Sequence, residues 1–230
     1  MIKAILFDFN GILINDEPLQ LRAYQEVLKQ EDIELSEKDY YESLGMDDVS
    51  FVRAAYQRAH LGLADNVLQR VLANKMKAHR EMLADELPVF DGAVNFVKQA
   101  RHHFALGVVS MARNDFIVDA LGRLNVLDAF SVIVSAEEVT RHKPDPECYN
   151  LGFRELDQMQ TAKGAFPLVR EEVLVIEDAP PGVAAAKAAG MWVLGITNTV
   201  SADELRRAGA DSVAKTLADW TSETVELVFR

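Results

Sequence analysis

Short, continuously apolar runs alternate with longer amphipathic stretches along most of the chain. The apolar runs predict buried parallel strands, the last of them at an edge: Ile2–Phe7, Phe104–Val109, Ser131–Val134, Val173–Ile176, Trp192–Ile196 and Ser212–Ala214. The amphipathic stretches between them have the length of helices: Asp91–Arg101, Asn114–Leu121, Pro146–Leu156 and Pro181–Ala189. Such alternation is typical of the α/β class, and it predicts a doubly wound parallel sheet of the Rossmann-like kind.

One long segment near the start of the chain departs from this alternation. Between residues 17 and 87 the apolar positions recur at helical spacing and no strand pattern is present. We therefore expect an all-helical cap domain at 17–87, inserted into a Rossmann-like core made of 1–16 and 88–230. Asp91 is the expected N-cap where the chain returns to the core, and Asp157–Arg170 is an expected surface loop.

Composition restricts the class of partner. The chain has 230 residues, 49% of them hydrophobic, which suffices for a substantial core. Its formal net charge of -12 argues against nucleic acid or an anionic membrane as partner, but it leaves a small phosphorylated metabolite possible. A single cysteine, Cys148, cannot form an internal disulfide, and no signal segment or membrane-spanning run is apparent. We expect a soluble, cytoplasmic monomer.

Polar residues suited to one chemistry follow four of the predicted strands. They are Asp8 and Asn10 after the first strand, Ser110 after the second, Lys143 after the third, and Glu177 with Asp178 after the fourth. Taken singly, each is explained by helix capping, a turn or a solvated surface position. Parallel strands, however, bring their carboxyl ends to one edge of the sheet. Together the residues predict a magnesium site of carboxylate oxygens (Asp8, Asp178 and Glu177) beside a phosphate-binding pair, Ser110 and Lys143.

The segments that carry these residues resemble, in order and spacing, the four motifs of the haloacid dehalogenase-like hydrolases. They are Phe7–Gly11, Val109–Ser110, Lys143–Pro146 and Ile176–Met191, and the match extends over nearly the whole chain. The resemblance is to the branch with a helical cap inserted after the first motif. That branch includes β-phosphoglucomutase and many sugar-phosphate phosphatases.

The resemblance implies a magnesium-dependent phosphatase in which Asp8 takes the phosphoryl group as an aspartyl phosphate. It implies that Mg2+ is held by Asp8, the backbone carbonyl of Asn10, Asp178 and Glu177. It further implies that the phosphoryl group is held by Ser110, Lys143 and the amides of Met111 and Ala112. Arg113 and the cap residue Lys75 are candidate substrate contacts, with a solvent-exposed position as the alternative for each.

The chain departs from the pattern of the phosphatases at Asn10, where they carry an aspartate that acts as general acid and base. An amide cannot exchange a proton in this way, and losing such a group typically slows turnover by about 10²–10⁴. The alternatives are a slow phosphatase that takes its proton from water, the cap or the substrate, or an inactive phosphate-binding protein. Asn10 itself could be natural or engineered. A β-phosphoglucomutase-like phosphotransferase ranks below these, because Gln20 replaces a frequent histidine and Asp48 is an acid where that mutase uses an arginine.

Overall fold

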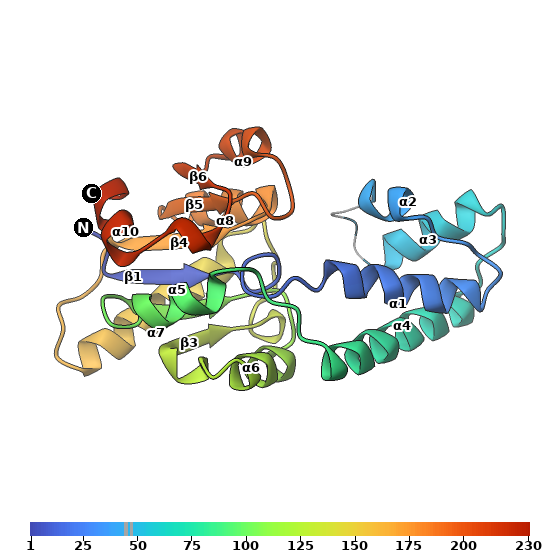
Figure 1. Cartoon of the computed structure of the whole chain (residues 1–230), viewed down its shortest axis with the longest axis horizontal. Coiled ribbons are helices and arrows are strands. Elements are labelled where there is room, and N and C mark those ends of the chain that lie inside the picture. Colours follow the sequence, from blue (N-terminus) through green and yellow to red (C-terminus); the bar gives the residue numbers. More distant parts are fainter. Residues whose placement is uncertain (44–45, 47) are drawn as a thin grey trace. The chain divides into compact units, whose positions relative to one another are not determined.

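The computed structural model describes residues 1–43, 46 and 48–230, and they form two compact units (Figure 1). One unit joins Met1–Asn15 to Val89–Arg230, and the other is Asp16–Pro88. Asp48, the acid noted in the sequence, is among the described residues, whereas its neighbours Leu44, Gly45 and Asp47 are not.

The first unit is built on a six-stranded parallel sheet with the strand order β3-β2-β1-β4-β5-β6. Its strands are β1 (Ala4–Phe7), β2 (Ala105–Val109), β3 (Phe130–Val134), β4 (Val173–Glu177), β5 (Trp192–Ile196) and β6 (Ser212–Ala214). The chain proceeds from β1 outward through β2 to β3 and then crosses to β4 on the other side of β1. The predicted α/β class and doubly wound sheet are confirmed, and the switch in strand order lies between β1 and β4.

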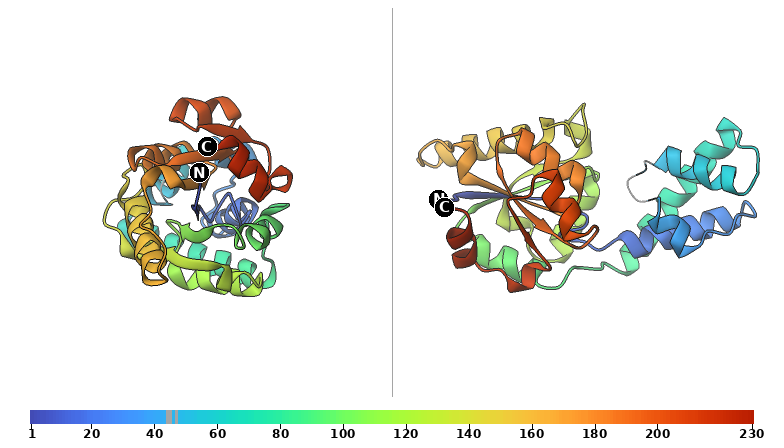
Figure 2. Two further views of the ribbon diagram at one scale, coloured as in Figure 1. Left: turned by 90° about the vertical axis from the view of Figure 1, so that its left-hand side faces the viewer. Right: turned by 90° about the horizontal axis from the view of Figure 1, so that it is seen from above.

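Helices cover both faces of this sheet, with α5 on one face and α7 on the other (Figure 2). The helices of the unit are α5 (Ala93–Ala100), α6 (Asn114–Arg123), α7 (Glu147–Ala162), α8 (Pro180–Ala188), α9 (Ala202–Ala208) and α10 (Ser222–Val228). Every residue of β1 is buried, and Phe7 packs edge-on against Phe96 and Phe130. Gly152 allows α7 to approach the sheet closely, since a Cβ there would lie 2.9 Å from Cγ2 of Val109. The central strand is thereby fixed firmly, together with the residue that follows it.

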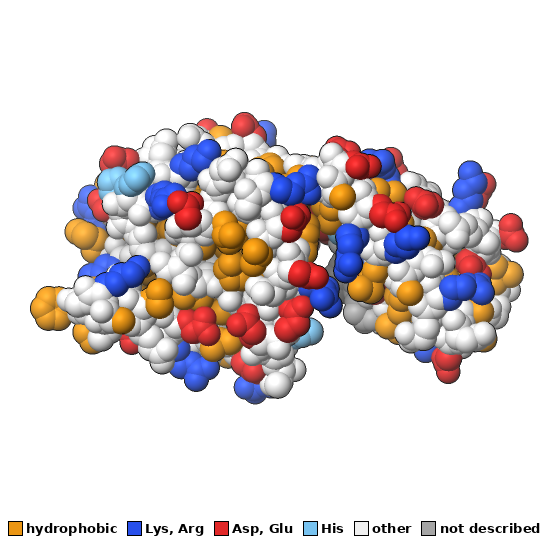
Figure 3. Space-filling view, turned by 90° about the horizontal axis from the view of Figure 1, so that it is seen from below, with side chains coloured by type: hydrophobic (Ala, Val, Ile, Leu, Met, Phe, Trp, Pro, Cys, Tyr) orange, Lys and Arg blue, Asp and Glu red, His pale blue; other side chains and the backbone are white. Residues whose placement is uncertain are grey.

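The second unit consists of helices in its described part. They are α1 (Glu17–Lys29), α2 (Glu37–Tyr41), α3 (Asp48–Arg58) and α4 (Asp65–Asp85). Their apolar faces enclose a separate core that includes Tyr24, Leu28, Val52, Leu68 and Val71. None of the helices in the described part of the chain is both long enough and apolar enough to cross a membrane. On the face drawn in Figure 3, lysine and arginine side chains are scattered among acidic ones.

Two local predictions are wrong. Asp91 is not an N-cap: α5 begins at Ala93, and its N-cap is Gly92 in the left-handed conformation. Gly92 is required there because a Cβ would lie 2.3 Å from the Cα of Ala218. The expected loop at Asp157–Arg170 is also partly helical, since α7 continues to Ala162 before Gly164 turns the chain at φ +85.

Candidate active site

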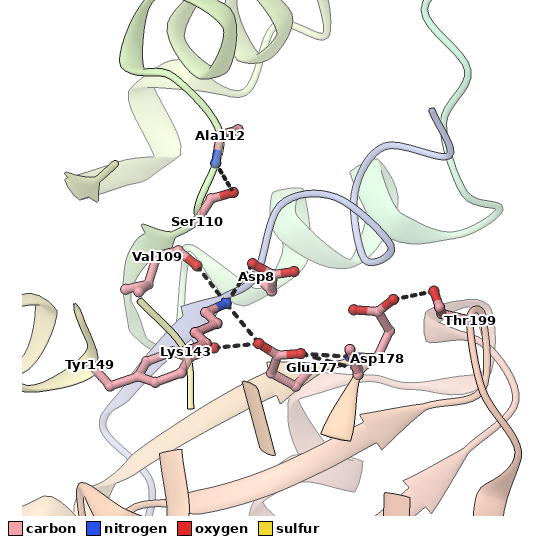
Figure 4. Close-up of polar contacts among 10 residues, drawn as sticks. Asp8, Val109, Ser110, Ala112, Lys143, Tyr149, Glu177, Asp178 and Thr199 are labelled. Carbon is pink, nitrogen blue, oxygen red and sulfur yellow. Dashed lines mark hydrogen bonds and ion pairs between the residues drawn. The ribbon is translucent and has the colours of Figure 1, made fainter. Parts of the chain in front are cut away.

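The candidate site lies at the carboxyl edge of the sheet, on the two sides of the switch point. Asp8 directly follows β1, Ser110 follows β2, and Glu177 is the last residue of β4 with Asp178 next to it. The register pairs Phe7 with Val108 on one side and with Ile176 on the other. Residues that are far apart in sequence therefore emerge side by side (Figure 4).

Lys143 connects two of the carboxylates. Its Nζ lies 2.7 Å from Oδ1 of Asp8 and 2.7 Å from Oε1 of Glu177, and it also donates to the Val109 carbonyl at 3.3 Å. The Lys143 side chain is only 10% exposed, so both ion pairs are largely shielded from water. The loop that carries it is held by Glu147, whose carboxylate accepts hydrogen bonds from the Thr140 amide at 2.9 Å and the Arg141 amide at 3.1 Å.

Glu177 is buried and accepts hydrogen bonds at both carboxylate oxygens. Besides Lys143, the hydroxyl of Tyr149 on α7 donates to Oε1 at 2.8 Å. Oε2 accepts from the Asp178 amide at 3.0 Å and the Ala179 amide at 3.2 Å. The carboxylate fits only because residue 182 is a glycine, since a Cβ there would lie 1.6 Å from Oε1. Sequence reasoning missed Tyr149, because its position on the buried face of a helix is typical of a core residue.

Asp178 is held by residues in the segments that follow β1 and β5. Its carboxylate rests on Gly11, whose φ is +80 and where a Cβ would lie 1.9 Å from Oδ2. Thr199, in the loop after β5, forms a hydrogen bond with Oδ2 of Asp178. The neighbouring Asn198 donates from Nδ2 to the Gly11 carbonyl at 2.7 Å. Sequence reasoning missed both, because an asparagine and a threonine after an apolar run are ordinary turn residues.

Negative charge exceeds positive charge in this site. One ligand oxygen from each of Asp8, Glu177 and Asp178 lies within 4.8 Å of the others, and only Lys143 among the residues described above balances them. Burial raises the pKa of Asp8 to about 7; Lys143 opposes the shift and Glu177 reinforces it. Burial, followed by Glu177 and Asp8, raises the pKa of Asp178 well above its usual range. Burial alone would lower the pKa of Lys143, but the carboxylates outweigh it and the pKa is raised.

This donor set fits a hard divalent cation such as Mg2+. Magnesium prefers carboxylate and carbonyl oxygens, and Asp8, Glu177 and Asp178 each offer one carboxylate oxygen. A cation here would oppose the effect of burial and favour the ionised forms of Asp8 and Asp178.

The residues predicted to bind phosphate or substrate after β2 differ in how far they are buried. Ser110 is buried, and its Oγ accepts a hydrogen bond from the Ala112 amide at 3.0 Å. Met111, between them, is half-buried. Arg113 is exposed and directs its Nε to Oδ1 of Asp115 at 3.1 Å, so its described ion pairs lie at the surface.

Asn10 lies in the tight turn that follows Asp8. Gly11 donates to the Ile14 carbonyl at 2.9 Å, and Leu13 donates to the Phe9 carbonyl at 2.8 Å. Asn10 is half-buried and forms a bridge with Ile14. The turn therefore holds an amide two residues after the carboxylate of Asp8.

Lys75 is in the helical unit, on α4. The solvent-exposed alternative is wrong, since Lys75 is 5% exposed. Its Nζ lies 3.3 Å from both carboxylate oxygens of Asp48 and 4.6 Å from the centre of the Tyr24 ring. In the same unit Gln20 donates to Oδ2 of Asp16 at 3.1 Å, and His79 Nε2 lies 3.4 Å from that oxygen.

Comparisons with known proteins agree with this architecture. The family model described as haloacid dehalogenase-like hydrolase matches residues 5–196. The validoxylamine A 7'-phosphate phosphatase of Streptomyces hygroscopicus subsp. limoneus is 30% identical over 228 residues, covering 95% of this chain and 96% of that protein. The phosphorylated carbohydrates phosphatase of Thermotoga maritima is 29% identical over 217 residues, covering 93% and 94%.

A solved structure is similar over the same extent. It is an aspartate-to-asparagine mutant of CbbY from Rhodobacter sphaeroides in complex with xylulose-(1,5)bisphosphate. The TM-score is 0.75 at 26% identity, with 95% of this chain and 96% of that chain covered.

Proposed function

The chain belongs to the haloacid dehalogenase-like hydrolases, and we propose that it is a phosphatase of small phosphorylated carbohydrates that works through Asp8. The observation that carries the proposal is the buried bridge from Lys143 to Asp8 and Glu177, with Asp178 beside it. A carboxylate held by a lysine at a strand end is placed to act as a nucleophile. The named activities of the two phosphatase relatives favour a phosphorylated carbohydrate as substrate.

The proposal includes Mg2+ as cofactor. The residues that would hold it are Asp8, Asp178, Glu177 and the backbone carbonyl of Asn10, all of them oxygen donors. When bound, Mg2+ supplies positive charge that favours attack on a phosphoryl group.

The first step transfers the phosphoryl group to the protein. An Asp8 carboxylate oxygen forms a bond to phosphorus as the bond to the sugar oxygen breaks, and the leaving sugar oxygen takes up a proton from water. Lys143 stabilises the charge on Asp8 and on the phosphoryl oxygens. Ser110 and the amides of Met111 and Ala112 would hold those oxygens, with the Ala112 amide exchanging its bond to Ser110 for one to the ligand.

The second step is hydrolysis of the aspartyl phosphate. Water attacks phosphorus, the bond to Asp8 breaks, and inorganic phosphate leaves with Asp8 regenerated. Asn10 limits both steps, because its amide neither donates a proton to the sugar oxygen nor removes one from water. We therefore expect turnover about 10²–10⁴ slower than with a carboxyl group at this position.

Asn10 also favours a second candidate function, a protein that binds a phosphorylated ligand with little or no turnover. The CbbY mutant, in which asparagine replaces an aspartate, holds a sugar bisphosphate. The retention of Asp8, Lys143, Glu177 and Asp178 together supports the enzyme over this candidate. Two further roles stay predictions: that the helical unit acts as a cap, and that Lys75 and Arg113 contact the substrate.

Phosphate release from a panel of sugar monophosphates and bisphosphates with Mg2+ tests the proposal. The unmodified chain is compared with Asn10→Asp, Asp8→Asn and the double variant. We expect slow release by the unmodified chain, faster release by Asn10→Asp, and none by either variant that lacks Asp8. Phosphate release that persists in Asp8→Asn would contradict the assignment of Asp8 as the nucleophile. Tight ligand binding with no release, both by the unmodified chain and by Asn10→Asp, would favour the binding function.

A further inference from the structure

The loop after β5 holds two parts of the candidate site at once, although it contains none of the four sequence motifs. We propose that Asn198 and Thr199 are positioning residues for the Mg2+ site. Thr199 orients the carboxylate of Asp178, and Asn198 fixes the turn at Gly11 that presents the Asn10 carbonyl. The inference rests on the proposed function, in which Asp178 and that carbonyl bind the metal.

The two held groups depend on each other's position. Gly11 and Asp178 are packed so closely that a Cβ on Gly11 would lie 1.9 Å from Oδ2. A shift of the turn would therefore move the carboxylate, and a rotation of the carboxylate would push on the turn. Asn198 holds Gly11 and the adjacent Thr199 holds the Asp178 carboxylate, so this loop sets the distance between Gly11 and Asp178.

Thr199 determines which oxygen of Asp178 is available. Its hydroxyl forms a hydrogen bond with Oδ2, the oxygen that rests on Gly11. Figure 4 shows the other oxygen directed toward Asp8. Groups that hydrogen-bond a metal-binding carboxylate fix its orientation, and their loss typically weakens metal binding about 10- to 100-fold.

The loop is itself anchored on both sides of the two residues. Before them, the Thr197 amide donates to the Ala214 carbonyl of β6 at 3.0 Å. After them, Ser201 and Glu204 form a capping box at the start of α9, with the Ser201 amide 3.0 Å from Oε2 of Glu204. Asn198 and Thr199 are thus presented by a fixed segment, as orientation of a carboxylate requires.

Titration of the full chain with Mg2+ alone, followed by calorimetry, tests the inference without depending on activity. The variants are Thr199→Val, which removes the hydroxyl at nearly constant volume, Thr199→Ser, which restores it, and Asn198→Ala. Thr197→Val is the matched control, because no hydrogen bond of its hydroxyl is found in the described part of the chain. The unfolding midpoint of each variant is measured without Mg2+ to detect a general loss of structure.

We expect Thr199→Val to bind Mg2+ about 10- to 100-fold more weakly than the unmodified chain, and Asn198→Ala also to bind it more weakly. Thr199→Ser and Thr197→Val should bind it as the unmodified chain does. Unchanged affinity in Thr199→Val, or equal losses in Thr199→Val and Thr199→Ser, would overturn the role of the hydroxyl. Unchanged affinity in Asn198→Ala would overturn the role of Asn198. No Mg2+ binding by the unmodified chain would instead overturn the metal site of the proposed function, and the positioning roles with it.

Discussion

Replacing Lys143 with methionine removes the ammonium group that joins the two buried carboxylates. Lys143 lies 2.7 Å from both Asp8 and Glu177, and the three side chains are 10%, 13% and 1% exposed. Breaking a buried ion pair by removing one partner typically costs about 3–5 kcal/mol, because the other charge is left without compensation. Two carboxylates lose their partner here, so we expect the free energy of unfolding to fall by at least the lower end of that range.

The loss should depend on pH and on Mg2+. Without metal, the folded state already binds protons at Asp8 more tightly than the unfolded state does, since its pKa is raised from 3.8 to about 7. The contribution of Asp8 to stability therefore falls as the pH rises from about 4 to 7, and removal of Lys143, which holds this pKa down, should extend the fall to higher pH. Mg2+ at a concentration 100 times its Kd would add about 2.7 kcal/mol to the stability of the folded state.

Urea unfolding at pH 6 and pH 8, with and without Mg2+, measures these effects. The control is Lys3→Met, which removes a surface pair with Glu172 and should cost no more than about 1 kcal/mol. A loss for Lys143→Met no larger than that of Lys3→Met, at either pH, would show that burial does not strengthen the Lys143 ion pairs.

Three further substitutions test the supports of the site. Gly182→Ala places a Cβ 1.6 Å from Oε1 of Glu177, so we expect a destabilisation of about 1–3 kcal/mol in urea unfolding and weaker Mg2+ binding; unchanged values for both would contradict the close packing. Tyr149→Phe removes a hydrogen bond to a charged group and should cost about 1.5–3 kcal/mol in the same assay, whereas a neutral effect would show that the bond is not formed. Hydrogen bonds, first from the Thr140 amide, lower the pKa of Glu147 to about 2. Its contribution to stability is therefore present above about pH 4.5 and lost as the pH falls toward 2, so Glu147→Gln should flatten the melting temperature profile over that interval; an unchanged profile would argue against it.

The sequence predicted those features that follow from the local pattern of apolar residues or from the general geometry of a parallel sheet. Apolar runs are sufficient to predict strands of this sheet, so the buried β5 and the half-buried edge strand β6 begin and end at the predicted residues. The convergence of Asp8, Lys143 and Glu177 followed from one property of parallel sheets, that strand ends share an edge.

The contacts that organise the site could not be predicted in this way. Tyr149, Asn198 and Thr199 act through single hydrogen bonds between segments far apart in the chain, and residue type does not indicate such bonds. The N-cap at Gly92 was missed for the same kind of reason, because its conformation follows from contact with Ala218. The extension of α7 beyond Leu156 was missed because polar residues on the exposed side of a helix also occur in loops.

Detection of the phosphoryl group on Asp8 tests the role of this residue as nucleophile most directly. The unmodified chain is mixed with a radiolabelled sugar phosphate and Mg2+, quenched in acid and digested, and the labelled peptide is identified by mass spectrometry. We predict a label on Asp8 that disappears more slowly in the unmodified chain than in Asn10→Asp, because Asn10 slows its hydrolysis, and that is absent in Asp8→Asn. Phosphate release without any label on Asp8, or a label on another residue, would contradict this prediction.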